Sequence, residues 1–185
     1  LAALRADLAP DSVAAAALRD PARPIVLVPQ RETSRLAAAV APCLPEVGAF
    51  LPYSPLHHIL MGDFGGPLVA TSANLSGEPV LTDPEEVRGR LSAVADGMLH
   101  HDRPIARPAD DSVLRVVAGA ARPVRLGRGR APVEITLPGA LSQPIVATGG
   151  QGKVAPALGW GDRVLLAPHV GDLDSPRAQD TFAAV

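Results

Sequence analysis

The chain has 185 residues, enough for one domain or for one domain and part of a second. Hydrophobic residues make up 47% and the formal net charge is −2. This composition excludes wholesale disorder and gives no general attraction to nucleic acid or anionic membranes. No apolar run approaches the roughly 18 residues that a membrane span needs. The N-terminal residues carry no signal-peptide pattern, so we expect a cytoplasmic protein.

The basic residues are almost all arginine, since Lys153 is the single lysine among 17 basic residues. Arginine suits planar, bidentate contacts with carboxylate or phosphate groups. A GC-rich coding bias also enriches Ala, Arg, Gly and Pro and accounts for the excess as a whole, so individual arginines must be argued from their positions. Cys43 is the single cysteine, which excludes an internal disulfide and a cysteine-based zinc site.

Hydrophobic periodicity, prolines and capping residues predict a series of short elements. In chain order these are two helical pieces over residues 1–20 broken at Pro10, a strand over 24–29, helices over 32–40 and 56–61, a strand over 67–70, and a helix over 84–94. Strands over 98–101, 112–117 and 123–126 follow. The mixture of strands and helices indicates an α/β or α+β fold.

A second domain is predicted after a segment rich in Pro, Gly and Ser, residues 131–144. We place a first domain at residues 1–133, a linker at 134–144 and the beginning of a second α/β domain at 145–185. Because the first and last residues lie inside apolar helical patterns without caps, we interpret the chain as a fragment of a longer protein.

The strongest local feature is the segment Thr-Ser-Ala-Asn-Leu-Ser-Gly-Glu-Pro at residues 71–79, directly after a predicted strand. Small hydroxyl and amide side chains at a strand end can bind ligand oxygens, and Gly77 permits backbone conformations that expose N–H groups to an anion. The same residues fit a turn whose side chains satisfy their own backbone. Composition alone favours the turn.

Two further groups carry charge. Asp110 and Asp111 follow Arg103 and Arg107, and such a group can hold Mg²⁺ and orient phosphates or form a surface ion-pair cluster. The second group contains four arginines interleaved with glycines in residues 122–130, which suits phosphate or a solvated basic loop. No aromatic stacking platform accompanies it, so nucleic acid is not an expected partner.

Two pairs of adjacent histidines raise the question of a metal, namely residues 57–58 and 100–101. Adjacent residues on a helix point about 100° apart, so such a pair seldom chelates one ion. No carboxylate or cysteine completes a ligand pattern, and we predict no protein-bound metal site. A histidine in residues 55–58 that hydrogen-bonds a substrate is the preferred interpretation.

Together these motifs resemble a known family. Residues 71–77 resemble the Ser-Ala-Asn motif of YrdC-like proteins, which make acyl-adenylates from ATP. Residues 51–58, 101–105 and 110–113 are similar to one branch of that superfamily, the hydrogenase maturation carbamoyltransferases or HypF family. The resemblance runs from about residue 21 to residue 174. Thr-Gly-Gly-Gln-Gly-Lys at 148–153 resembles the opening phosphate loop of that family's transfer domain.

The resemblance implies a fold and a reaction. The fold would be a twisted mixed sheet flanked by helices, followed by the start of an actin/sugar-kinase-like α/β domain. The reaction would form carbamoyl-adenylate from carbamoyl phosphate and ATP with Mg²⁺. The carbamoyl group would then pass to a C-terminal cysteine of a partner protein, as a step toward the cyanide ligands of nickel–iron hydrogenase.

The resemblance also implies site residues, although it identifies no catalytic nucleophile. The residues expected to bind nucleotide are Thr71, Ser72, Asn74, Ser112 and Arg125. The residues expected to bind substrate are Tyr53, His57, His58, Arg103, Asp110 and Asp111. Positioning and charge stabilisation by hydroxyl, amide and arginine groups suffice for displacement at phosphorus.

Two alternative functions remain open. A threonylcarbamoyl-adenylate synthase of tRNA modification would usually carry an arginine where this chain has Phe50, which favours the carbamoyl branch. A truncated YrdC-like module, inactive or binding RNA, is the other alternative. The family's Lys/Arg-rich nucleotide motif would lie upstream of residue 1, so we expect the chain alone to be weakly active or inactive.

Overall fold

The computed structural model describes residues 1–184, which form two compact units. Unit 1 contains residues 1–70 and 111–130. Unit 2 contains residues 71–110 and the described residues from 131 onward. Each unit is therefore assembled from two separate stretches of chain. None of the helices in the described part of the chain is both long and apolar enough to cross a bilayer.

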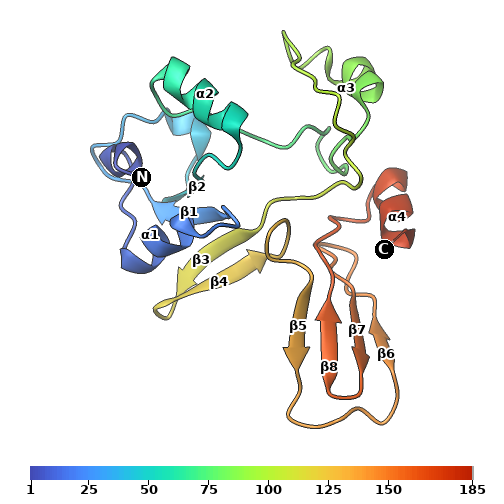
Figure 1. Ribbon diagram of the computed structural model, residues 1–185. Coiled ribbons are helices and arrows are strands. Elements are labelled where there is room, and N and C mark those ends of the chain that lie inside the picture. The colour runs from blue at the N-terminus through green and yellow to red at the C-terminus, as the bar shows by residue number, and fades with distance from the viewer. Residues whose placement is uncertain (185) are drawn as a thin grey trace. The chain divides into compact units, whose positions relative to one another are not determined.

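Unit 1 is built on a four-stranded mixed sheet with the strand order β2-β1-β3-β4 (Figure 1). Its strands are β1 (Ile25–Pro29), β2 (Glu46–Ala49), β3 (Val113–Val117) and β4 (Ala120–Arg125). β1 pairs in parallel with β3, whereas the β1–β2 and β3–β4 pairs are antiparallel. The predicted mixed sheet with flanking helices is confirmed.

The core of unit 1 lies between this sheet and helix α1 (Ser12–Arg19). Asp11 caps α1 by accepting a hydrogen bond from the Ala14 N–H at 2.7 Å, as its place before the helix predicts. β1 alternates, so that Val26 and Val28 are fully buried against Leu18 and Leu114. Aliphatic and alanine packing thus forms the core, as a chain with 3% aromatic residues requires.

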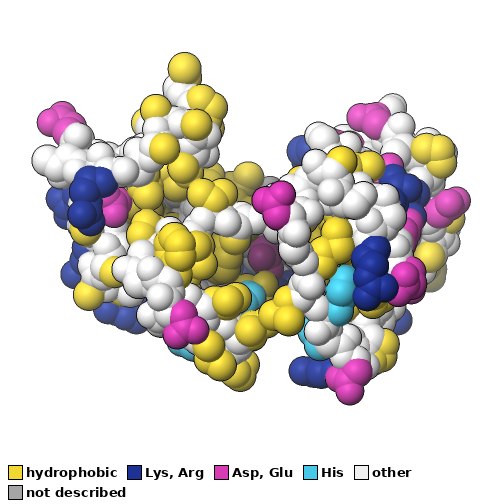
Figure 2. All heavy atoms as spheres, turned by 90° about the horizontal axis from the view of Figure 1, so that it is seen from above, with side chains coloured by type: hydrophobic (Ala, Val, Ile, Leu, Met, Phe, Trp, Pro, Cys, Tyr) yellow, Lys and Arg dark blue, Asp and Glu magenta, His cyan; other side chains and the backbone are white. Residues whose placement is uncertain are grey.

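Three further helical elements complete unit 1: the 3₁₀ helices η1 (Ala3–Ala6) and η2 (Ala38–Val40) and helix α2 (Pro55–Phe64). Ser54 caps α2, Pro55 occupies its first turn, and Gly65 ends it with φ of +72°. α2 buries none of its side chains and leaves four apolar residues exposed, Leu56, Ile59, Leu60 and Phe64. Figure 2 shows hydrophobic side chains at the surface in several places.

Unit 2 contains a four-stranded antiparallel sheet in the order β5-β8-β7-β6 (Figure 1). The strands are β5 (Val133–Thr136), β6 (Ile145–Ala147), β7 (Ala157–Trp160) and β8 (Arg163–Leu166). Helices α3 (Pro84–Leu91) and α4 (Pro176–Ala183) belong to the same unit. Asp83 caps α3 and Ser175 caps α4, each through a side-chain oxygen that accepts a backbone N–H.

Several predicted elements are absent or shorter. Residues 67–70 and 98–101 form no strand, because they find no partner strand, and Val69 and Leu99 are 79% and 75% exposed. The predicted helix over 32–40 reduces to η2. Tertiary hydrogen bonds replace helical ones there, since the Arg35 N–H donates to the Asp7 carboxylate at 2.8 Å. Strands β2, β5 and β7 were not predicted, and β5 includes the first residues of the segment predicted as a linker.

Truncation of the buried side chain on β3 tests this account of the core. Leu114→Ala should lower the free energy of unfolding by about 2–5 kcal/mol, because the fully buried side chain leaves a cavity. Val124→Ala on β4, where the side chain is 64% exposed, should change it by less than about 1 kcal/mol. Urea unfolding followed by circular dichroism measures both free energies. An equal loss of free energy in the two variants would contradict the assignment of Leu114 to the core.

Candidate functional site

The Ser-Ala-Asn segment of unit 2 forms a turn that is closed by the side chain of Asn74. The Asn74 side-chain amide donates to the Leu75 carbonyl at 2.9 Å and to the Glu78 carbonyl at 3.0 Å. The Ser72 hydroxyl donates to the Asn74 side-chain oxygen. The Leu81 N–H donates to the Ala73 carbonyl at 2.9 Å, which joins the two ends of the turn. The hydrogen-bonding turn foreseen from composition is therefore present.

The predicted site residues fall in both units. Unit 1 holds Tyr53, His57, His58, Asp111, Ser112 and Arg125, and unit 2 holds Thr71, Ser72, Asn74, Arg103 and Asp110. Thr71, Ser72 and Arg103 are exposed, and Asn74 is partly buried. The roles assigned to these residues stay predictions.

In unit 1, Ser112 is fully buried just before β3. Its hydroxyl accepts a hydrogen bond from the Gly127 N–H at 2.9 Å and donates to the Arg128 carbonyl at 3.2 Å. The Arg125 Nε–H donates to the Asp111 carbonyl at 2.9 Å. Hydrogen bonds of Ser112 and Arg125 thus connect the end of β4 and the following arginine–glycine loop, residues 126–130, to the start of β3.

Arg128, in the same loop, contacts both a carboxylate and an aromatic ring. Its guanidinium pairs with the Asp111 carboxylate at 2.7 Å and lies over the Tyr53 ring, 3.9 Å from the ring centroid. The His57 ring stands edge-on to Tyr53 at 4.5 Å between centroids. A planar cation between a carboxylate and an aromatic ring is an arrangement that lysine does not reproduce. Three residues predicted to bind substrate, Tyr53, His57 and Asp111, are therefore brought together.

This geometry shifts the pKa of Tyr53, which is the only tyrosine of the chain. Partial burial raises the pKa of Tyr53, the Asp111 carboxylate raises it further, and the Arg128 guanidinium lowers it. Arg128 was not selected from the sequence, because four similar arginines compete within residues 122–130. The useful signal is the glycine on either side of it, since such a loop can bring its backbone close to neighbouring chain. At Gly129, with φ of +81°, an added Cβ would lie 2.7 Å from the Ala22 Cβ.

In unit 2, Asp110 contacts a residue from the second part of the chain. The Asp110 carboxylate lies 3.1 Å from Nδ1 of His169, whose side chain is only 8% exposed. Asp172 accepts hydrogen bonds from both the backbone and the side-chain amino group of Lys153, at 2.7 and 2.6 Å. Hydrogen bonding from Lys153 lowers the pKa of Asp172. His169, Lys153 and Asp172 were not among the predicted site residues.

The remaining predicted residues have simpler surroundings. His58 is exposed on α2, and the Arg103 N–H donates to the His101 ring at 3.1 Å. Residues 1–184 contain no cluster of three or more His, Cys, Asp or Glu side chains that could hold a metal ion. Asp110 and Asp111 instead contact His169 and Arg128.

Comparison with known families assigns the two parts of the sequence. A family model for Sua5/YciO/YrdC proteins, described as "Telomere recombination", matches residues 2–127. A model of the "HypF Kae1-like domain" matches residues 140–185. The fold and these matches define a YrdC-type segment that is followed by a Kae1-like segment.

Relatives are similar across both segments. The carbamoyltransferase HypF of Rhodobacter capsulatus is 48% identical over 171 residues, which cover 91% of this chain and 23% of the relative. The carbamoyltransferase HypF of Synechocystis is 40% identical over 173 residues, with 94% and 23% covered. The chain thus spans about a quarter of the length of these curated relatives.

Two solved structures of HypF proteins are also similar to this chain. A full-length HypF in a phosphate- and nucleotide-bound form matches with a TM-score of 0.91 and 34% identity, over 98% of this chain and 29% of that chain. The HypF of T. kodakarensis matches with a TM-score of 0.88 and 29% identity, over 97% and 23%. The chain belongs to the Sua5/YciO/YrdC family, and along almost its whole length it is similar to HypF proteins, which are named carbamoyltransferases.

Ionisation of Tyr53 tests the geometry around Arg128. Arg128→Met should raise the pKa of Tyr53, because the ring stays covered while the cation is lost, and Asp111→Asn should lower it. Because Tyr53 is the only tyrosine, tyrosinate absorbance during an alkaline titration reports it alone. A raised folded-state pKa stabilises the fold below the unfolded-state pKa, and this contribution is lost as pH rises toward the folded-state pKa. Identical titrations for both variants and the unmodified chain would contradict the arrangement.

Proposed function

We propose that the protein forms carbamoyl-adenylate from carbamoyl phosphate and ATP and takes part in transfer of the carbamoyl group to a cysteine of a partner protein. The observation that carries this proposal is the similarity to HypF carbamoyltransferases across both segments, including a relative described as phosphate- and nucleotide-bound. The Ser-Ala-Asn turn adds local support, because it presents the Ser72 hydroxyl at the surface of unit 2.

The proposed chemistry is displacement at the α-phosphorus of ATP. Water first hydrolyses carbamoyl phosphate, which breaks the bond to its phosphate group and releases carbamate and inorganic phosphate. A carbamate oxygen then forms the new bond to the α-phosphorus, and pyrophosphate leaves with the bonding electron pair. Such a step requires positioning and stabilisation of negative charge rather than a protein nucleophile. Thr71, Ser72 and Asn74, in the turn of unit 2, are the proposed nucleotide contacts. Mg²⁺ would accompany the phosphates and neutralise part of their charge.

The structure limits what Ser112 and Arg125 can do. Both donate to backbone carbonyls, and Ser112 is fully buried. Their proposed contribution is therefore to hold the loop that carries Arg128, a cation whose planar group suits phosphate oxygens. The Asp111 carboxylate pairs with the Arg128 guanidinium in the structure. A bound anion would contact this guanidinium beside Asp111 or displace the Asp111 carboxylate from it.

Pyrophosphate exchange tests the proposed reaction. The protein encoded by the complete gene should incorporate labelled pyrophosphate into ATP when carbamoyl phosphate is present. Exchange that requires threonine and bicarbonate, and ignores carbamoyl phosphate, would overturn the proposal in favour of threonylcarbamoyl-adenylate synthesis.

Substitution in the turn tests the site. Ser72→Ala should lower the carbamoyl-phosphate-dependent exchange rate at least about tenfold, because one hydrogen-bond donor to the nucleotide phosphates is lost. Ser76→Ala is the matched control, because Ser76 is also an exposed serine of residues 71–79 and has no proposed contact. Its rate should remain within about twofold of the unmodified protein. Equal effects of the two substitutions would remove Ser72 from the site.

A further inference from the structure

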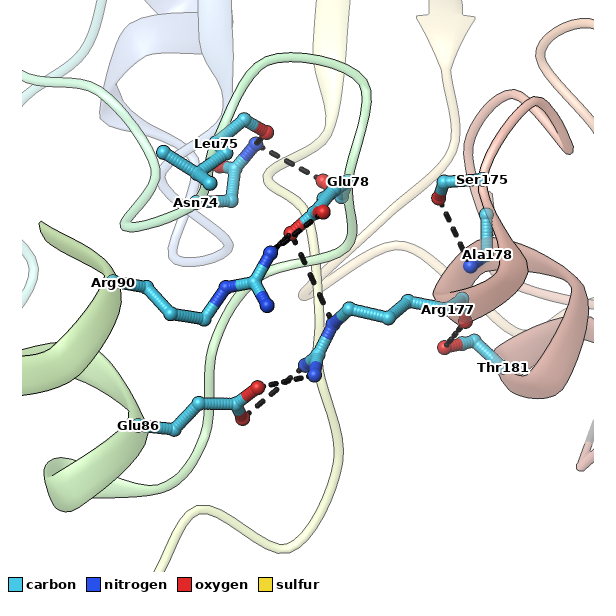
Figure 3. Close-up of polar contacts among 9 residues, drawn as sticks. All are labelled: Asn74, Leu75, Glu78, Glu86, Arg90, Ser175, Arg177, Ala178 and Thr181. Carbon is cyan, nitrogen blue, oxygen red and sulfur yellow. Dashed lines mark hydrogen bonds and ion pairs between the residues drawn. The ribbon is translucent and has the colours of Figure 1, made fainter.

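Four charged side chains of unit 2 form a network beside the Ser-Ala-Asn turn (Figure 3). They come from three places: Glu78 at the end of the turn, Glu86 and Arg90 on α3, and Arg177 on α4. The Arg90 guanidinium contacts the two Glu78 carboxylate oxygens at 2.7 and 2.5 Å. The Arg177 guanidinium pairs with Glu86 and approaches Glu78, with Nε 4.0 Å from the carboxylate. Two arginines thus neutralise two carboxylates.

Glu78 is the residue through which the network reaches the turn. Its backbone carbonyl accepts the hydrogen bond from the Asn74 side-chain amide at 3.0 Å. Its carboxylate, at the other end of the same residue, is held by arginines from two helices. Movement of the Glu78 side chain would therefore disturb the residue that orients Asn74, and Asn74 in turn contacts the Ser72 hydroxyl.

Arg177 is placed where a helix does not favour a cation. It lies in the first turn of α4, immediately after Pro176, and the partial positive charge of a helix N-terminus opposes a guanidinium there. Nearby carboxylates offset this, and Glu86 lies in the first turn of α3, where an acid is favourable. The backbone of α4 is fixed at this end by the Ser175 cap and by the almost fully buried Ala178. Arg177 is therefore presented from a rigid position.

We propose that Arg177, in the Kae1-like segment, is a positioning residue for the nucleotide-binding turn of the YrdC-type segment. It acts through Glu86 and Glu78 and touches no substrate. Residues 140–185 would thus help to set the orientation of Ser72 and Asn74, so that the proposed adenylate-forming site depends on the Kae1-like segment. This inference rests on the proposed function for its kinetic consequence but not for its structural one.

The kinetic test uses pyrophosphate exchange by the protein encoded by the complete gene. Arg177→Ala should raise the KM for ATP about fivefold or more, while the KM for carbamoyl phosphate changes by less than about twofold. Arg177→Lys should give an intermediate KM for ATP, because lysine keeps the charge but not the forked geometry. The charge swap Arg177→Glu with Glu86→Arg should recover more activity than either single substitution.

Arg88→Ala is the matched control, since Arg88 forms an exposed ion pair with Glu85, and neither residue is one of the four that form the network. It should leave the KM for ATP unchanged. An Arg177→Ala protein with the kinetics of Arg88→Ala would overturn the kinetic part of the proposal.

Hydrogen exchange tests the structural part independently of activity. Arg177→Ala should accelerate exchange of the Asn74, Glu78 and Leu81 amides, which bond within the turn, and leave the β1 amides unchanged. If the unmodified protein shows no pyrophosphate exchange that depends on carbamoyl phosphate, the proposed function fails. Hydrogen exchange still decides whether Arg177 positions the turn. Unchanged protection of the turn amides would show that Arg177 does not position it. If Arg177→Ala does not fold, Arg177→Lys and the charge swap provide the same comparison.

Discussion

The parallel pairing of β1 with β3 is the constraint on which unit 1 depends. The two strands are neighbours in the sheet, although residues 30–112, which include all of residues 71–110 of unit 2, lie between them in the chain. Closing so long a loop costs conformational entropy, which burial of Val26, Val28 and Leu114 offsets. The pairing extends to the residue before β3, because the Ile25 N–H donates to the Ser112 carbonyl at 2.9 Å. Ser112 is thereby placed where Gly127 and Arg128 reach its hydroxyl.

Arginine geometry explains how the charged residues are used. Arg128 needs a planar group to lie over Tyr53 while pairing with Asp111, and Arg177 needs a fork to contact Glu86 while its Nε faces Glu78. These arrangements are specific even in a chain that is rich in arginine throughout. In contrast, the Arg88–Glu85 pair is largely exposed and contributes little to stability. The position of an arginine, rather than the number of arginines in the chain, therefore decides whether its guanidinium holds other residues in place or lies exposed to solvent.

The sequence predicts the parts of this fold that local patterns specify. The caps Asp11 and Asp83 begin α1 and α3, and the apolar runs at β1 and β3 form central strands. Residues 67–70 show the limit, because an apolar run becomes a strand only when another strand is available to pair with it. Glycine-containing β2 and β7 were missed for the opposite reason, since partners stabilise strands of weak intrinsic preference.

The candidate site shows the same division between local and long-range information. Spacing along the chain directed attention to the motif at 71–77 and to the cluster at 110–112, and Tyr53, His57 and Asp111 do come together around Arg128. The adjacent acids Asp110 and Asp111 do not act as a pair, because their partners are His169 and Arg128. Those partners lie 59 and 17 residues away in the chain, a separation that no local pattern encodes.

The turn and ligand-site interpretations of residues 71–79 are compatible. The Asn74 amide donates to the carbonyls of Leu75 and Glu78, so its side-chain oxygen is fixed in one direction and accepts from Ser72. This oxygen holds the Ser72 hydroxyl ready at an exposed position. A phosphate oxygen that accepted the Ser72 hydrogen would replace one acceptor with a charged and stronger one, at little cost in side-chain ordering. Under the proposed function, the hydrogen bonds that make the segment a turn would also pre-organise it to bind an anion, and the ion pairs of Glu78 with Arg90 and Arg177 would extend that pre-organisation to α4.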